Sequence, residues 1–244
     1  MTQITSIQAI SVVIPVYNEA GNIAVLTEEI IDKLSNKQFD YELIYIDDGS
    51  SDNTLFVLYE LKQKFPWIKI IAHKKNYGQS AALCTGVRQS TNPIVVTLDG
   101  DGQNDPSDIA ALCSFVTDSK TIILGTRVNR KDTFWRKIVS KTGNRIRNLV
   151  LHDGCPDSGC SLKVFPREAF MELPKFNHMH RFLPALFLQK GYKLINVPVN
   201  HRGRLSGVSK YGTLERFFAG IYDLIGVTWL SRRSFLVECK NENE

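Results

Sequence analysis

The sequence predicts an α/β fold in which a mostly parallel β-sheet is flanked by helices. Short apolar runs alternate along the chain with longer stretches of helical periodicity, and this order of elements is typical of parallel sheets. The runs are almost continuously apolar, which indicates strands buried on both faces. A chain of 244 residues can bury a sizeable core, so we expect one main domain over residues 1–212 and an amphipathic helix and tail over 213–244.

Each predicted strand is a short apolar run that ends in a polar turn. The strands are expected at residues 9–15, 41–46, 68–72, 93–98, 121–124, 162–165 and 192–198. The helices are expected at residues 22–34, 53–65, 78–89, from 106 onward, and at 180–189. Pro106 supports the fourth of these helices, because its ring fixes φ in the first turn.

The composition is that of an ordinary folded protein with a formal net charge of +5. There is no long apolar stretch before Ser11, and no apolar segment reaches the roughly 18 residues that a membrane-spanning helix needs. We therefore expect neither a signal peptide nor a membrane span. The cysteines include one close pair but no second pair for a zinc site, so we expect reduced thiols in a cytoplasmic protein. They are Cys84, Cys113, Cys155, Cys160 and Cys239.

Three polar turns follow three of the predicted strands, at residues 17–19, 47–49 and 99–101. Ligands of such sheets bind beyond the carboxyl ends of the strands, so we expect the turns to converge on one rim. Asp48 could accept a hydrogen bond from a ribose or a base, and could equally cap the next helix. The sequence has no Gly-x-Gly-x-x-Gly after the first strand and no Walker-type Gly-Lys-Ser, which argues against a dinucleotide oxidoreductase and a P-loop NTPase.

Asp99 and Asp101 are separated by a single glycine at the end of a predicted strand. Two carboxylates at such a turn provide hard oxygen ligands of the kind that magnesium or manganese uses together with substrate phosphates. The simpler interpretation is an Asp/Gly turn without a ligand. The neighbouring polar turns favour the metal site.

Four segments resemble the motifs of family 2 glycosyltransferases, most closely the polyprenyl-phosphate branch of the dolichyl-phosphate mannose synthase type. They are residues 14–19, 47–52, 76–79 and 99–103. The motifs occur in the family's order, and the resemblance extends over roughly residues 10–233. It implies a GT-A, Rossmann-like fold, a nucleotide-diphosphate sugar as donor, Mg²⁺ or Mn²⁺ as cofactor, and a membrane polyprenyl phosphate as acceptor. The protein would then work at the cytoplasmic face of a membrane.

The resemblance also implies roles for individual residues. The implied donor-binding residues are Pro15, Tyr17, Glu19, Ile46, Asp48, Asp99, Gly100, Asp101, Arg127, Arg204 and Lys210. The implied metal ligands are Asp99, Asp101 and Gln103, and the implied catalytic residues are Asp99, Asp101, Arg127 and Lys210. Arg204 and Lys210 have the six-residue spacing of two phosphate contacts in the family's mobile loop over the donor, and Arg202 is the alternative if the register differs.

A basic stretch follows the fifth predicted strand, and one acidic residue, Asp132, interrupts it. A run of charge is normally a solvated helix face, but an active site for phosphates also needs cations. Its basic residues are Arg130, Lys131, Arg136, Lys137, Lys141, Arg145 and Arg147. Nucleic acid could use the same charges, yet no nucleic-acid-binding motif accompanies them, so we expect no such partner. The resemblance places Asp157 and Ser158 near the acceptor, as candidates for lining the sugar pocket. His180 and Arg181 could also face the sugar, and a capped structural turn at the start of their helix is an equal alternative.

The C-terminal segment has an apolar stripe at helical spacing. Its members are Leu214, Phe217, Phe218, Ile221, Leu224, Ile225 and Trp229. Packing against the sheet would explain the stripe, but its aromatic residues and the following Arg232 and Arg233 also suit a helix on an anionic membrane surface. Many relatives carry membrane-spanning helices after the catalytic domain. Their absence here leaves direct surface contact and an integral-membrane partner as alternatives.

The implied reaction is inverting transfer of a hexose to a polyprenyl phosphate. A phosphate monoester has a second pKa near 6, so it needs no general base at neutral pH. Transfer to a sugar hydroxyl of a glycolipid or polysaccharide is the alternative, and it would need a base such as Asp157. A catalytically silent nucleotide-sugar-binding subunit is the second alternative, which the presence of the metal and phosphate residues disfavours.

Overall fold

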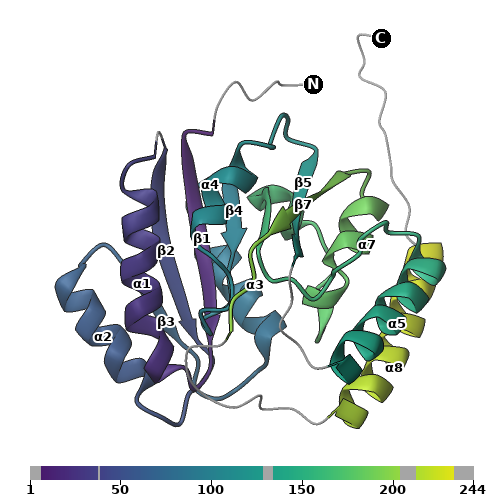
Figure 1. Ribbon diagram of the computed structural model, residues 1–244, viewed down its shortest axis with the longest axis horizontal. Coiled ribbons are helices and arrows are strands. Elements are labelled where there is room, and N and C mark those ends of the chain that lie inside the picture. Colours follow the sequence, from purple (N-terminus) through teal and green to yellow (C-terminus); the bar gives the residue numbers. More distant parts are fainter. Residues whose placement is uncertain (1–6, 38, 129–133, 204–212, 234–244) are drawn as a thin grey trace.

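The computed structural model describes residues 7–37, 39–128, 134–203 and 213–233 of the chain. These residues form a seven-stranded sheet with the strand order β3-β2-β1-β4-β6-β5-β7. Helices cover both faces of the sheet, and α5 and α8 lie side by side at the end of the molecule opposite α2 (Figure 1). The α/β fold with a mostly parallel sheet is therefore confirmed.

All seven predicted strands are present, with ends shifted by a few residues. Their bounds are β1 Ala9–Val16, β2 Asp40–Asp47, β3 Lys69–Ala72, β4 Ile94–Thr97, β5 Thr121–Arg127, β6 Lys163–Pro166 and β7 Lys193–Val199. β6 runs antiparallel to both of its neighbours, β4 and β5, whereas the other pairs are parallel. Because β6 inserts between these strands, the turn that precedes it reaches the same edge of the sheet as the ends of β4 and β5.

The helices alternate with the strands as expected. Their bounds are α1 Ala20–Leu34, α2 Thr54–Lys64, α3 Gln79–Gln89, α4 Ser107–Cys113, α5 Phe134–Leu151, α6 Arg167–Met171, α7 Leu183–Gln189 and α8 Thr213–Arg233, with a 3₁₀ turn η1 at Met179–Arg181. Helix α5 occupies the region that was interpreted only as a basic stretch, and α6 was not predicted. The predicted helix over 180–189 divides into η1 and α7 at Phe182, whose φ of -110° and ψ of 3° depart from helical values.

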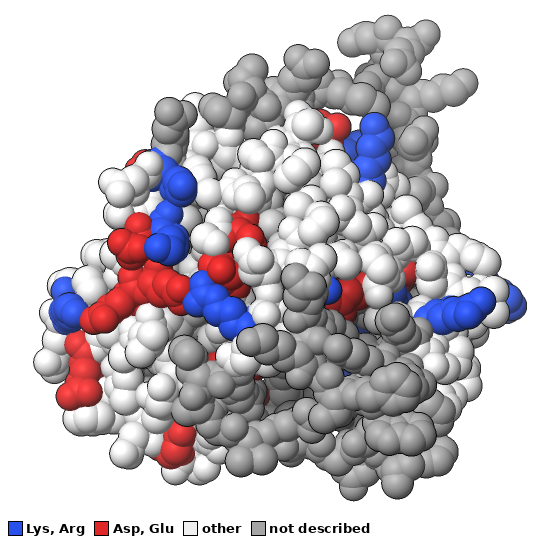
Figure 2. Space-filling model, viewed as in Figure 1, with Lys and Arg blue, Asp and Glu red and all other residues white. Residues whose placement is uncertain are grey.

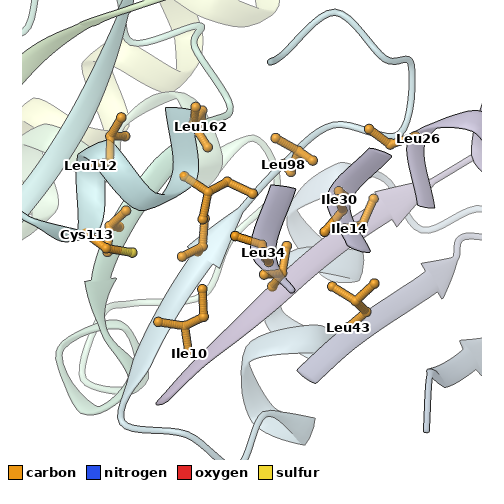
Figure 3. Close-up of a cluster of buried hydrophobic side chains, with 14 of the residues drawn as sticks. Ile10, Ile14, Leu26, Ile30, Leu34, Leu43, Leu98, Leu112, Cys113 and Leu162 are labelled. Atoms are coloured by element: carbon orange, nitrogen blue, oxygen red, sulfur yellow. The ribbon is translucent and has the colours of Figure 1, made fainter. Parts of the chain in front are cut away.

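The core has two layers, one on each face of the sheet. Alternate residues of β1 divide between them: Ile10, Val12 and Ile14 face the layer that contains α1, α2 and α4, whereas Val13 faces the layer of α3, α6 and α7. Figure 3 shows the first layer, where Leu26, Ile30 and other α1 side chains lie against the sheet. Burial on both faces explains why the strands are apolar at consecutive positions.

Only part of the apolar surface of the C-terminal helix α8 packs against this core. Val227 is buried, and Leu224 packs against the second layer. Ile225 and Trp229 remain 65% and 63% exposed. The predicted stripe is thus divided between packing and exposure in its described part, and residues 204–212 and the side chains of 213–219 lie outside the description. Within the described chain, no helix has both the length and the apolar character needed to cross a membrane.

Helix α3 approaches the sheet so closely that Gly86 has no room for a side chain. A Cβ atom there would lie 2.3 Å from Val13 Cγ1 and 2.6 Å from Ile46 Cδ1. We expect Gly86→Ala to lower the free energy of unfolding by about 1–3 kcal/mol, because the core must shift to accept a methyl group. Urea unfolding measures the effect.

The matched control is Gly143→Ala in α5, where a Cβ would meet no atom within 4 Å. Alanine favours a helix over glycine, so this variant should be as stable as the parent or up to about 1 kcal/mol more stable. Equal effects of the two substitutions would show that α3 does not pack as closely as described.

Candidate active site

A pocket of about 390 Å³ lies at the edge of the sheet where β1, β2 and β4 end. The backbone brings the three polar turns together: Asp48 N donates to Val16 O at 2.9 Å, and Leu98 N donates to Val13 O at 3.1 Å. Most of the predicted donor-site residues within the described chain line this pocket. They are Pro15, Tyr17, Glu19, Asp48, Asp99, Gly100, Asp101 and Arg127. Ile46, which was also predicted to bind the donor, does not line this pocket and is fully buried among the side chains of the second core layer.

Asp99 and Asp101 present two carboxylates to the pocket. Asp99 Oδ1 accepts a hydrogen bond from Gln79 Nε2 at 2.8 Å, and Asp101 Oδ1 accepts one from Gln103 N at 3.1 Å. Desolvation and repulsion by Asp101 raise the pKa of Asp99 to about 6. Two mutually repelling carboxylates in a pocket are a site at which a divalent cation would stabilise the ionised forms.

The two carboxylates of Asp99 and Asp101 fit a site in which Mg²⁺ or Mn²⁺ is held by the protein together with a bound substrate. No group of three or more His, Cys, Asp or Glu residues suited to a metal occurs in the described chain, so these side chains alone do not form a closed cage. Magnesium commonly takes one or two carboxylates and completes its shell with phosphate and water. Gln103 also lines the pocket, with its Nε2 directed at Arg202 O at 3.5 Å.

Asp48 organises the turn between β3 and α3. Its Oδ1 accepts a hydrogen bond from Tyr77 N at 3.0 Å, and its Oδ2 accepts one from Gly78 N at 2.7 Å. His73 Nδ1 lies 2.7 Å from Oδ1, and His73 Nε2 lies 2.9 Å from Thr85 Oγ1. The carboxylate is therefore a structural anchor for this turn, and a contact with ribose or base stays a prediction.

The first and second turns are tied to each other. Asn18 has a left-handed φ of 53°, and its backbone N donates to Ser50 Oγ at 2.9 Å. Glu19 N donates to Thr54 Oγ1 at 2.8 Å, and its carboxylate accepts a hydrogen bond from Asn22 Nδ2 at 2.6 Å. These bonds place the Tyr17–Glu19 turn against the start of α2, which shapes one wall of the pocket.

Arg127 and Asp157 form an ion pair beside the pocket. Arg127 Nε donates to Asp157 Oδ2 at 2.7 Å, and Arg127 Nη2 donates to Oδ1 at 2.8 Å. Burial opposes the charge of Arg127, but the bonds to Asp157 outweigh it and raise the pKa of the guanidinium. Asp157 was predicted to line the sugar pocket. It does not line the cavity, and instead orients Arg127, which does.

Arg147 does not belong to a phosphate-binding surface, which corrects part of the basic-stretch interpretation. Its guanidinium is buried and donates to Asp153 Oδ2 at 2.9 Å and to Asn144 Oδ1 at 2.6 Å. It also contacts Ser158 Oγ. Arg145 is exposed on the same helix. The side chains of the other basic residues in this stretch lie outside the description.

Arg202, the alternative phosphate contact, is paired with two carboxylates and does not line the pocket. Its two Nη atoms lie 2.6 Å from Glu29 Oε1 and 2.6 Å from Asp105 Oδ1. Figure 2 shows acidic and basic side chains intermingled on this face over α1. Arg204 and Lys210, the preferred candidates, lie outside the described residues.

The opposite wall of the pocket includes three of the four residues predicted near the sugar, Ser158, His180 and Arg181. His180 Nδ1 lies 2.8 Å from Ser80 Oγ, which links η1 to α3. Sequence reasoning missed Gln79 and Lys163, which also line the pocket. Gln79 ends the motif at residues 76–79, so its polar side chain could have been predicted to face the site. Lys163 interrupts the apolar predicted strand at 162–165, and a charged residue in such a strand could have indicated a buried functional lysine.

Comparisons with known proteins agree with this geometry. The model of "Glycosyl transferase family 2" matches residues 11–174. The chain is 34% identical over 232 residues to dodecaprenyl-phosphate galacturonate synthase of Rhizobium johnstonii, covering 91% of this chain and 67% of that protein. The chain therefore belongs to glycosyl transferase family 2, and it is a glycosyltransferase.

Solved structures show the same fold at low identity. Glucosyl-3-phosphoglycerate synthase from Mycobacterium tuberculosis, in complex with Mn²⁺, UDP and glucosyl-3-phosphoglycerate, has a TM-score of 0.67 at 19% identity and covers 92% of this chain and 80% of its own. Another structure of that enzyme holds Mg²⁺ and UDP. Mannosyl-3-phosphoglycerate synthase from Rubrobacter xylanophilus has a TM-score of 0.69 at 14% identity, with 95% and 77% coverage. The GT-A fold is thereby confirmed.

The buried pair of Arg147 and Asp153 should be a strong determinant of stability. Arg147→Met leaves the fully buried Asp153 carboxylate without its cation, and breaking one side of a buried pair costs about 3–5 kcal/mol. Arg145→Met, on the exposed side of the same helix, should change stability by no more than about 0.5 kcal/mol. Urea unfolding of both variants checks this, and similar small losses would contradict the burial of the pair.

Proposed function

We propose that this glycosyltransferase moves a sugar, with inversion, from a nucleotide-diphosphate donor to a membrane polyprenyl phosphate. The carrying observation is that Asp99, Asp101 and Arg127 meet in one pocket at the sheet edge. A pair of carboxylates for a cation and a guanidinium for phosphate are the groups that a departing diphosphate requires. The similarity to a dodecaprenyl-phosphate galacturonate synthase supports the lipid phosphate as acceptor.

In this mechanism the chain contributes charge and orientation. When bound, Mg²⁺ or Mn²⁺ at Asp99, Asp101 and Gln103 would supply Lewis-acid stabilisation of the leaving group. Asp157 accepts hydrogen bonds from Arg127 Nε and Nη2, which uses two of the five N–H groups of the guanidinium. The other N–H groups would contact the diphosphate. We assign Arg204 and Lys210 to the same diphosphate from the motif spacing alone.

A phosphate acceptor also agrees with the state of Asp157. Transfer to a hydroxyl needs a base, and Asp157 was the candidate for it. Both carboxylate oxygens of Asp157 accept hydrogen bonds from Arg127, and proton transfer from an acceptor would compete with that pair. A polyprenyl phosphate is already dianionic near neutral pH, so no base is required.

We further propose that α5 and α8 contact the membrane, at its cytoplasmic face. Both helices expose large apolar side chains: Leu149 of α5 is 73% exposed, and Ile225 and Trp229 of α8 are similarly accessible. The two helices lie side by side (Figure 1), and Arg232 and Arg233 follow at the end of α8. An aromatic-rich helix pair next to cations suits an interface with anionic lipid. Contact with an integral-membrane protein is the competing use of this surface.

Substitution of Asp101, a predicted metal ligand, tests the proposed reaction directly. Purified protein is given UDP- and GDP-sugars in turn, with Mn²⁺ or Mg²⁺ and a polyprenyl phosphate, and nucleotide release and glycolipid are measured. Asp101→Asn should lower turnover by at least about 100-fold, because losing one electrostatic partner of a transition state costs roughly 3 kcal/mol. EDTA should abolish turnover, and added Mn²⁺ should restore it.

The control is Asp118→Asn, a carboxylate in the turn before β5 that bonds to Thr121 Oγ1 and is not part of the pocket. It should keep most of the activity. Turnover that resists EDTA, or an active Asp101→Asn enzyme, would refute the metal role. Transfer to soluble sugars but not to polyprenyl phosphate would refute the acceptor.

The membrane proposal predicts salt-sensitive binding to anionic vesicles. Ile225→Glu with Trp229→Glu should release the protein from phosphatidylglycerol vesicles in a sedimentation assay, because two exposed apolar contacts become charged. Binding of the parent should weaken with salt, since charges are screened within roughly 8 Å at physiological ionic strength. The double variant should still bind UDP or GDP with Mn²⁺.

The matched control is Phe56→Glu with Tyr59→Glu, which charges two exposed aromatic residues of α2 at the opposite end of the molecule. This variant should bind vesicles like the parent. Equal loss in both variants would indicate nonspecific adhesion, and full binding by the α8 variant would assign the membrane contact to another surface or a partner.

A further inference from the structure

Lys163 is a buried cation at the base of the pocket. It begins β6 and lies opposite Thr97 of β4 and Leu124 of β5. β4 leads into the turn of Asp99, and β5 ends at Arg127, and both residues line the pocket. Only 4% of Lys163 is exposed, and its side chain lines the cavity. The antiparallel insertion of β6 therefore brings the Lys163 ammonium near both Asp99 and Asp157.

The ammonium of Lys163 holds the turn that precedes β6. Its Nζ donates to Ser158 O at 3.4 Å and also to Cys160 O. The same turn is closed by Cys160 N, which donates to Asp157 O at 3.1 Å. A single cation thus ties two carbonyl groups of the 157–160 turn to the sheet.

The 157–160 turn fixes the position of the Arg127 side chain through Asp157. Asp157 accepts three hydrogen bonds from Arg127, from the backbone N at 3.3 Å and from the side-chain Nε and Nη2. A Cβ on Gly159 would lie 3.2 Å from Arg127 Nη2, so the backbone of the turn is in close contact with the guanidinium. A shift of the turn would necessarily move Arg127.

Packing alone does not explain a lysine at this position. Burial disfavours its charge and lowers its pKa, although nearby Asp99 and Asp157 act in the opposite direction. A methionine of similar length would fill the space without desolvating a charge, and buried charges generally cost more than such apolar replacements. The hydrogen bonds to the turn are what the ammonium provides and methionine does not.

We propose that Lys163 is a positioning residue for Arg127, acting through the 157–160 turn so that the guanidinium is held toward the anionic leaving group. The proposal depends on the proposed function only for the identity of that anion, a nucleoside diphosphate. The positioning itself is a property of the protein without a ligand.

The first measurement needs no substrate. In ¹⁵N-labelled protein, the Nε–H signal of Arg127, assigned by its loss in Arg127→Lys, should exchange slowly with solvent because Asp157 accepts it. Lys163→Met should raise this exchange rate by about tenfold or more, since the turn is released. Lys163→Gln retains N–H donors and should restore part of the protection. Lys69→Met, which removes a part-buried ion pair with Glu42 in a different part of the sheet, should have no effect.

The second measurement tests whether Arg127 contacts the terminal phosphate of a nucleoside diphosphate. Titration calorimetry with Mn²⁺ compares UDP with UMP, and GDP with GMP, on the parent and on each Lys163 variant. Lys163→Met should weaken diphosphate binding by about tenfold and leave monophosphate binding unchanged, because only the diphosphate carries the group that Arg127 contacts. A merely destabilised protein would lose both to the same extent.

The two measurements separate the two levels of the proposal. Unchanged Arg127 exchange in Lys163→Met overturns the positioning role. Faster exchange together with unaltered diphosphate binding, or no binding of UDP or GDP to the parent, refutes the diphosphate role of Arg127 and leaves the positioning role intact. Failure of both Lys163 variants to fold would assign the lysine to the core and overturn the proposal.

Discussion

The parallel pairing of β1 with β2 and β4 is the constraint on which the site depends. Parallel strands end at the same edge, so three turns far apart in sequence become neighbours there. The central strands β1, β2 and β4 are largely buried on both faces, and a cluster of charged side chains lies in the turns beyond their ends. The core and the site are therefore two consequences of one arrangement, because the residues that cannot enter the core collect where a ligand can reach them.

Charge at the sheet edge is balanced largely within the protein. Arg127 is paired with Asp157, Arg147 with Asp153, and Lys163 with backbone carbonyl groups. Isolated buried charges would be prohibitive, whereas paired and hydrogen-bonded ones are tolerated. Asp99 differs from these pairs, because desolvation and repulsion by Asp101 raise its pKa. A divalent cation would offset the repulsion between these two carboxylates.

The 157–160 turn connects the chemistry of the pocket to the architecture of the sheet. It exists at this edge because β6 runs antiparallel between β4 and β5. From there it carries the partner of Arg127 and part of the pocket wall. Helices α5 and α8, at the far side of this region, expose apolar side chains that the core does not use. In the proposed function, the pocket for the nucleotide-sugar donor and the membrane-contacting surface belong to the same chain.

The sequence by itself determined the strands, most helices, the family and the acidic turns, because apolar periodicity and short motifs are local properties of the chain. It did not determine the direction of β6, the exclusion of Ile46 from the pocket, or the partners of Asp157, Arg147 and Arg202. Those features depend on which segments meet across the sheet. The local sequence around a charged residue does not show whether that residue faces solvent, a ligand or a buried counter-charge. Only the tertiary structure shows that Lys163 lies under the site, since burial of its ammonium is decided by strands distant along the chain.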